Sequence, residues 1–179
     1  MGTSLGGLQA LETVLGALPS KFPVPVVVVQ HRNKNSDNTL THLLKRHTAL
    51  TVYDAEDKMP LEPSAVYISP PNYHTLVEDG YIALSCDGPV QYARPSIDVL
   101  FESAAASYGR GTIGVIMTGA SSDGAQGAAA IKNKGGVAIA QNPGTAEAAA
   151  MPAAAIAAAK VDYILPLAEI GPTLVTLCR

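Results

Sequence analysis

Pro25-Val26-Val27-Val28-Val29 is an apolar run in which four β-branched residues follow one another without polar alternation. Such a run is typical of a parallel β-strand that is covered on both faces, because a strand with one solvated face alternates between apolar and polar residues. Similar runs follow at residues 65–69, 112–118, 137–141 and 162–165. Together these segments predict a parallel sheet in which residues 25–29 form a central strand.

Segments with helical periodicity separate these runs. Residues 7–18 carry one apolar stripe, which consists of Leu8, Leu11, Val14, Leu15 and Leu18. Residues 97–108 follow Ser96, and serine is a residue type that caps helix N-termini. Three more helices are expected at residues 124–134, 152–159 and 168–177. The alternation predicts an α/β fold, a doubly wound and mostly parallel sheet with helices on both faces.

One stretch departs from this alternation of strands and helices. Residues 75–78 and 81–86 flank Asp79-Gly80, a dipeptide that favours a two-residue turn between antiparallel strands. We therefore expect an antiparallel hairpin at an edge of the sheet.

Composition and charge exclude several classes of protein. The chain has 179 residues, a formal net charge of -3 and a pI near 5.7, so it has no field that would attract nucleic acid or anionic lipid. Its apolar stretches are too short or too interrupted for membrane insertion. Two unpaired cysteines, Cys86 and Cys178, and a start without a secretory segment indicate the cytoplasm. We expect a single domain spanning residues 1–179.

Gly2-Thr3-Ser4-Leu5-Gly6-Gly7 places a serine in a tight turn immediately before the first amphipathic helix. Flanking glycines relieve crowding in such a turn, and a helix N-terminus presents free N–H groups, so the segment suits a nucleophile beside an anion site. A serine hydroxyl reacts poorly unless a base takes its proton. A histidine therefore has to lie within reach of Ser4.

The base and a carboxylate can be chosen by position, because the working residues of a doubly wound sheet gather at the carboxyl ends of its strands. His31 directly follows the first apolar run, whereas the other three histidines lie on a polar helical segment or in a Pro-Pro-Asn-Tyr loop. Asp123 follows the run at 112–118 through a four-residue loop. We therefore predict Ser4 as the nucleophile, His31 as its base and Asp123 as the group that orients the base.

The order of these three residues disfavours one rival class. In α/β-hydrolases the serine is followed first by the acid and then by the histidine. Here no histidine follows residue 74, so that class does not fit.

These motifs resemble those of the bacterial chemotaxis protein-glutamate methylesterases of the CheB type, in their C-terminal catalytic domain. The family has a G-x-S-x-G-G elbow, a Q-H pair after the second strand and a T-G-x-x-x-D-G loop, and all three occur here. The resemblance covers nearly the whole chain. Further similar stretches lie at residues 55–57, 66–70, 94–101, 140–142 and 151–152.

The resemblance implies a serine hydrolase that demethylates glutamyl methyl esters on the cytoplasmic helices of chemoreceptors and releases methanol, with deamidation of receptor glutamines as a secondary activity. Backbone N–H groups near Leu5 and Ala120 would bind the oxyanion. Arg94 would help to place the substrate. The resemblance implies neither a cofactor nor a metal.

The chain also departs from the family pattern. Leu5 stands where the family often has threonine, and Ala120-Ser121-Ser122 stands where it often has Met-Gly-Asn; backbone donors survive such changes, but side-chain contacts do not. The family usually carries an N-terminal receiver domain, which we expect to be absent from residues 1–179. The strand that should precede the Ser4 turn is expected to lie before residue 1, as in a truncated domain. Nothing in the sequence indicates an oligomeric state.

Two other interpretations stay open on the residues alone. A serine in a glycine-rich turn often caps a helix or binds phosphate, so the chain could be a doubly wound module that binds a nucleotide without catalysis, although it lacks the G-x-G-x-x-G spacing and a Walker lysine. It could also be a methylesterase that is inactive because its first strand is missing. In the first case His31 is an ordinary strand-end histidine and Asp123 caps the following helix.

Overall fold

The structure is a computed structural model that describes residues 1–33, 35–36 and 39–179. Its main sheet has seven strands in the order β3-β4-β2-β1-β7-β8-β9, and every neighbouring pair is parallel. The strands are β1 (Gly2–Thr3), β2 (Val26–Gln30), β3 (Thr51–Asp54), β4 (Ala65–Ile68), β7 (Ile113–Ile116), β8 (Val137–Gln141) and β9 (Tyr163–Leu165).

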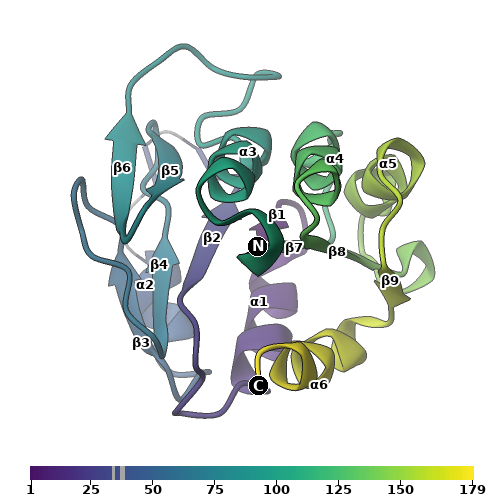
Figure 1. The fold of residues 1–179 in the computed structure, drawn as a ribbon, viewed down its shortest axis with the longest axis horizontal. Coiled ribbons are helices and arrows are strands. Elements are labelled where there is room, and N and C mark those ends of the chain that lie inside the picture. Colours follow the sequence, from purple (N-terminus) through teal and green to yellow (C-terminus); the bar gives the residue numbers. More distant parts are fainter. Residues whose placement is uncertain (34, 37–38) are drawn as a thin grey trace.

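Helices cover both faces of this sheet (Figure 1), which confirms the predicted doubly wound fold. On one face lie α1 (Gly7–Gly16), α2 (Thr39–Leu44) and α6 (Leu167–Leu177), and on the other lie α3 (Ile97–Tyr108), α4 (Ala125–Asn133) and α5 (Ala150–Ala158). Short 3-10 helices occupy Gly109–Gly111 and Pro143–Thr145. Each face has its own apolar core: Leu11, Leu15 and Leu174 belong to the first, and Leu100, Phe101 and Ile131 to the second.

The strand order reverses at β1, which lies between β2 and β7. Gly2 pairs with Val29 on one side and with Ile116 on the other. Gly2 and Thr3 form the described part of this central strand, directly before the Ser4 turn. Gly2 has to be glycine because a Cβ there would lie 2.4 Å from a side-chain carbon of Ile97. In doubly wound sheets the crevice at such a reversal is where ligands bind.

The expected antiparallel hairpin is confirmed as β5 (His74–Glu78) and β6 (Tyr81–Ser85), joined at Asp79-Gly80. It forms a separate two-stranded sheet, and it packs beside α3 (Figure 1). Hydrogen bonds hold it there, among them those from Val77 N to Ser103 Oγ at 3.0 Å, from Ser107 Oγ to Val77 O at 2.9 Å and from Gly80 N to Tyr108 Oη at 2.9 Å. A long loop then leads from β6 over the top of the molecule to α3.

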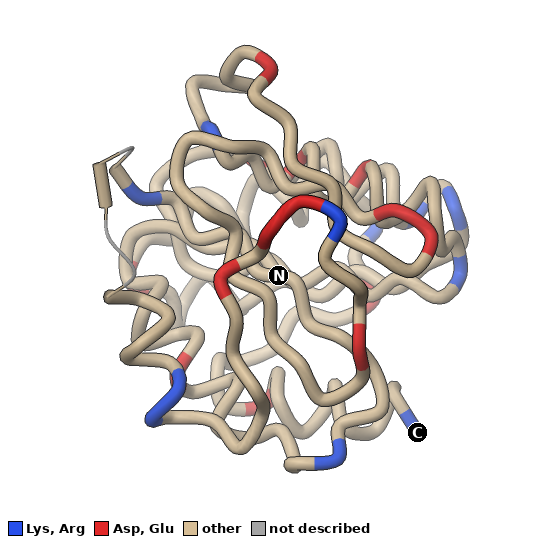
Figure 2. Tube along the Cα trace, turned by 90° about the vertical axis from the view of Figure 1, so that its left-hand side faces the viewer, with Lys and Arg blue, Asp and Glu red and all other residues tan. Residues whose placement is uncertain are grey.

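Charged residues are dispersed along the chain trace. Figure 2 shows Lys and Arg interspersed with Asp and Glu on the face it presents, which agrees with the small net charge of -3. Within the described ranges, no helix combines the length and apolar character needed to cross a bilayer.

Candidate active site

The three predicted site residues lie at the carboxyl ends of adjacent strands. Ser4 follows β1, His31 follows β2, and Asp123 lies in the loop that follows β7. Backbone hydrogen bonds hold these ends side by side: His31 N donates to Thr3 O at 3.0 Å, and Ser4 N donates to Thr118 O at 2.9 Å. The fold therefore brings together segments that lie almost 120 residues apart in the sequence.

Ser4 occupies a turn that requires glycine at two positions. Gly7 N donates to Ser4 O at 2.9 Å, and Gly6 adopts a left-handed φ of 76°, which glycine accepts without strain. A Cβ on Gly7 would lie 1.9 Å from Oε1 of Gln30. Side chains at either position would displace the turn that presents the Ser4 hydroxyl.

Asp123 is buried, with 1% of its surface exposed, and its carboxylate accepts four hydrogen bonds. The donors are His31 Nε2 at 2.7 Å, Ile97 N at 2.7 Å, Ser96 Oγ at 2.8 Å and Asp98 N at 3.0 Å. Burial alone would raise the pKa of Asp123, but these bonds, with that from His31 foremost, hold the pKa below its ordinary value. Asp123 is therefore ionised at neutral pH.

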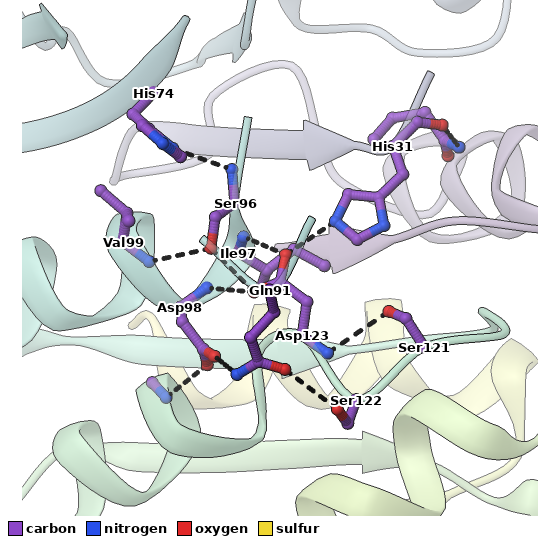
Figure 3. A network of polar contacts seen from close by, with 12 residues as sticks. His31, His74, Gln91, Ser96, Ile97, Asp98, Val99, Ser121, Ser122 and Asp123 are labelled. Atoms are coloured by element: carbon purple, nitrogen blue, oxygen red, sulfur yellow. Dashed lines mark hydrogen bonds and ion pairs between the residues drawn. The ribbon is translucent and has the colours of Figure 1, made fainter. Parts of the chain in front are cut away.

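The charge state of Asp123 fixes the tautomer of His31. An ionised carboxylate can only accept hydrogen bonds, so Nε2 of His31 carries the hydrogen in the bond to Asp123 Oδ2 (Figure 3). In the neutral imidazole Nδ1 then bears the free lone pair. His31 is partly exposed, with 17% of its side chain accessible. It can therefore take a proton at Nδ1.

Ser4 and His31 are neighbours across two paired strands. Thr3 pairs with Gln30, and Ser4 and His31 directly follow these two paired residues. Both residues line one cleft. Within the described residues no hydrogen bond to the Ser4 hydroxyl is formed, so the hydroxyl is not held by another side chain.

Two backbone N–H groups beside Ser4 suit an oxyanion. Leu5 directly follows the serine and lines the cleft. Ala120 follows Gly119, and a Cβ on Gly119 would lie 2.9 Å from Ser4 Cβ, so this loop abuts the serine. Among the backbone hydrogen bonds of the described residues, none uses the N–H of Leu5 or Ala120. Both donors therefore remain available near Ser4.

Three polar side chains brace the site in ways that the sequence did not reveal. Gln30 Nε2 donates to both Ser4 O at 2.8 Å and His31 O at 2.9 Å, which holds the backbone of Ser4 and that of His31 together. Thr118 Oγ1 donates to Leu5 O at 2.8 Å. Ser96, which we expected only to cap α3, also donates to Asp123. Gln30 was signalled only as a member of the Q-H motif, because its bonds depend on tertiary packing.

Arg94 lies in the loop before α3, and its side chain contacts residues that flank the hairpin. Its guanidinium donates to Asn72 Oδ1 at 2.6 Å and to the carbonyls of Cys86 and Asp87, each at 2.9 Å. Arg94 is not among the residues that line the cleft at Ser4. Its contribution to substrate placement stays a prediction.

The cleft at Ser4 is wide and open, with a volume of about 820 Å³. Its walls come from the turn and first part of α1, from the end of β2 and from the segment before α5. Two carboxylates, Glu12 and Glu147, lie on its lining with Ser4 and His31. An open cleft of this size can receive a side chain that projects from a larger macromolecule.

Comparison with known proteins gives consistent results. The family model of the CheB methylesterases matches residues 1–174. A putative protein-glutamate methylesterase/protein-glutamine glutaminase of Leptospira interrogans is 45% identical over 178 residues, which cover 99% of this chain and 92% of that protein. The protein-glutamate methylesterase FrzG of Myxococcus xanthus is 38% identical over 175 residues, and this chain spans 52% of its length.

A solved structure shows the same architecture. The crystal structure of the Thermotoga maritima CheB methylesterase catalytic domain superposes with a TM-score of 0.94 at 35% sequence identity. The match covers 98% of this chain and 95% of that domain.

Proposed function

The chain belongs to the CheB methylesterase family, and from that premise we propose that it is a serine hydrolase that cleaves glutamyl methyl esters on chemoreceptors and releases methanol. The observation that carries the proposal is the 2.7 Å bond between His31 Nε2 and an otherwise saturated Asp123 carboxylate, beside Ser4. It leaves Nδ1 of the imidazole as a base. A phosphate-binding module without catalysis would not need that arrangement.

In the first half of the reaction His31 Nδ1 takes the proton of the Ser4 hydroxyl as its oxygen attacks the ester carbonyl. The oxyanion that forms accepts hydrogen bonds from the N–H groups of Leu5 and Ala120, each worth about 3 kcal/mol where such donors have been tested. The imidazolium returns its proton to the methoxide leaving group. Methanol departs, and the glutamyl group remains bonded to Ser4 Oγ.

In the second half water replaces methanol. His31 takes a proton from the water, whose oxygen attacks the acyl-enzyme, and then gives that proton back to Ser4 Oγ. Asp123 holds the imidazole in its productive tautomer and stabilises the imidazolium. An amide can enter the same sequence with ammonia as the leaving group, which agrees with the glutaminase part of the relatives' names.

The substrate side of the proposal rests on the relatives and on the shape of the site. An esterified glutamate on an exposed receptor helix can reach Ser4 through the open cleft. Since the helices that carry such esters are cytoplasmic, we place the protein in the cytoplasm. Arg94 belongs to this proposal as a residue that positions the receptor rather than the scissile ester.

The decisive experiment measures methanol release from methylated receptor helices by the wild type, by Ser4→Ala and by Ser20→Ala. We expect Ser4→Ala to lose at least about 1000-fold in rate. Ser20 is an exposed serine after α1, so Ser20→Ala should match the wild type. A fluorophosphonate probe should label Ser4 in the wild type and fail to label it in His31→Ala. Equal methanol release by the wild type and Ser4→Ala would refute the proposal.

A further inference from the structure

The loop between β6 and α3 adopts an unfavourable backbone conformation at its tip. Gln91 has a φ of 47° and Tyr92 a φ of 64°, values that residues other than glycine rarely adopt. Val90 and Ala93 close this tip with two mutual backbone hydrogen bonds of 3.1 and 2.9 Å. Strained backbone of this kind persists only where other contacts hold it in place. The side chain of Gln91 supplies such contacts.

The amide of Gln91 joins two segments on opposite sides of Asp123. Gln91 Nε2 donates to Asp98 Oδ2 at 2.8 Å, and Ser122 Oγ donates to Gln91 Oε1 at 3.0 Å (Figure 3). Asp98 lies in the first turn of α3, and Ser122 directly precedes Asp123 in the chain. One side chain thus bridges the helix that donates to Asp123 and the loop that carries it.

Asp98 is the link through which this bridge reaches the site. Its backbone N donates to Asp123 Oδ1 at 3.0 Å, and its own Oδ1 accepts from Gly127 N at 2.7 Å. Burial raises the pKa of Asp98 to about 6, and the charges of Asp123 and Glu102 act in the same direction. A buried carboxylate so close to another one needs neutral donors, and the Gln91 amide is one of them.

We propose that Gln91 is a positioning residue, which clamps Asp98 and Ser122 and so sets the orientation of Asp123 toward His31. The inference rests on the proposed function, because it assigns a role in the same catalytic line. Gln91 itself touches neither Ser4 nor His31 through any hydrogen bond of the described residues. It acts through the two groups that hold the carboxylate.

A purely structural role of Gln91 would affect folding and leave the catalytic step intact. The side chain is exposed at the surface, so the protein should stay folded without it, although the thermal midpoint should fall because contacts to the strained tip and to Asp98 are lost. A positioning role would instead lower kcat on a small ester without changing KM, since Gln91 is not among the residues that line the cleft at Ser4. The two roles therefore separate in the kinetics.

The test compares Gln91→Ala with the matched control Tyr92→Ala in the same loop. Tyr92 is fully exposed, and no hydrogen bond of its side chain is formed within the described part of the chain. We expect Gln91→Ala to lower kcat about 10-fold to 100-fold, the range for small displacements of a catalytic group, with KM within twofold of the wild type. Tyr92→Ala should keep the wild-type kcat on a small activated ester. A wild-type kcat in Gln91→Ala would overturn the proposal.

Gln91→Glu supplies a second readout. It places a carboxylate against Asp98, and only a proton shared between the two can restore the bond, so the activity relative to the wild type should rise as the pH falls from 8 toward 6. Ser122→Ala, which removes only the bond to Gln91 Oε1, should give a smaller loss than Gln91→Ala. A relative activity of Gln91→Glu that does not change with pH would contradict the contact with Asp98.

Failure of this inference can be told apart from failure of the proposed function. The rate of fluorophosphonate labelling at Ser4 reports the nucleophile without any receptor substrate. If the wild type releases no methanol from receptor helices but Gln91→Ala still slows labelling about 10-fold or more, the positioning role stands and the substrate assignment falls. If labelling is equally fast in both proteins, the positioning role falls.

Discussion

The two ends of the parallel sheet differ in the polarity of the cavities beside them. At the carboxyl end, Ser4 and His31 line an open cleft of about 820 Å³ among polar loops. At the amino end of the same strands lies a smaller cavity of about 250 Å³, whose walls are mainly apolar and include Phe22, Val26 and Phe101. Strands β1 and β2 connect the two ends, and each strand is only a few residues long.

The two ends differ in polarity because backbone N–H groups without a partner in the sheet or helices are concentrated at the carboxyl end. At the carboxyl end the strands run into turns and helix N-termini, whose N–H groups need acceptors, and Asp123 is such an acceptor for Ile97 and Asp98 at the start of α3. At the amino end, packed apolar side chains surround the cavity. Substitutions at the two ends should therefore separate activity from stability.

The largest effect is expected from Asp123→Asn at the carboxyl end. An asparagine would stabilise the wrong tautomer of His31, because its amide can turn an N–H toward Nε2, and kcat should fall on the order of 10⁴-fold. Asp79→Asn at the exposed hairpin turn is the matched control, since Asn-Gly also favours that turn. Steady-state ester hydrolysis checks both variants, and a loss below tenfold in Asp123→Asn would contradict a catalytic role of the carboxyl end.

The next effect is expected at the amino end, from Phe101→Ala. Phe101 is 2% exposed and lines the apolar cavity. It is also tightly packed, because a Cβ added to Gly127 would lie 2.5 Å from Cβ of Phe101. Removing the ring should lower the free energy of unfolding by about 3–5 kcal/mol. Chemical denaturation measures that loss. At temperatures where the variant stays folded, kcat should match the wild type, and a large drop in kcat would show that the two ends are coupled.

A smaller effect is expected from a single methyl group placed beside the serine. In Gly119→Ala the new Cβ would lie 1.9 Å from Sδ of Met151 and 2.9 Å from Cβ of Ser4. Ser4 has to shift, and if it is the nucleophile that we propose, kcat should fall about 100-fold. Gly111→Ala is the control near the amino end, because its nearest neighbour is Cβ of Tyr108 at 3.8 Å. Equal activities of the two variants would contradict a tightly fitted serine.

The smallest effect concerns pH and the carboxylate next to Asp123. Because the pKa of Asp98 is raised to about 6 by burial, the folded state binds its proton more tightly than the unfolded state does. The stabilisation from Asp98 is thus fully present below pH 4 and is lost as the pH rises through 6. Relative to Asp98→Asn, the wild type should lose about 1–2 kcal/mol of unfolding free energy between pH 4 and 7.

Thermal or chemical unfolding of both proteins across that range measures the change. Asp123 contributes with the opposite sign, because its pKa is lowered, so its stabilisation is lost as the pH falls. Taking the difference between wild type and Asp98→Asn isolates the Asp98 contribution. A difference that stays constant from pH 4 to 7 would mean that Asp98 titrates normally.

Sequence patterns predicted the parts of the fold that depend on local periodicity. The apolar run at residues 25–29 became β2, and the Asp79-Gly80 hairpin formed as expected. Strand β3 was not predicted, because only two of its four residues, Val52 and Tyr53, are apolar, and a single one of them is buried. His31 and Asp123 could be predicted because strand ends in such sheets converge.

The contacts that finish the site were beyond prediction, since each joins residues far apart in the chain. Gln30 reaches back 26 residues to Ser4, and Ser96 reaches forward 27 residues to Asp123. Arg94 is similar: its bonds to Asn72 and to the carbonyls of Cys86 and Asp87 were not predicted, and its contact with substrate stays a prediction.

The alternation of strands and helices and the tight turn under Ser4 could be read from the sequence, because they depend on period and turn chemistry. Strand polarity further predicted Ser4, His31 and Asp123 as a cluster of candidate residues. The three-dimensional structure adds that Gly2 and Thr3 lie between β2 and β7, that Nε2 of His31 binds Asp123 and leaves Nδ1 free, and that Gln91 joins Asp98 to Ser122. Those outcomes depend on register and on hydrogen bonds between distant segments, which no local pattern encodes.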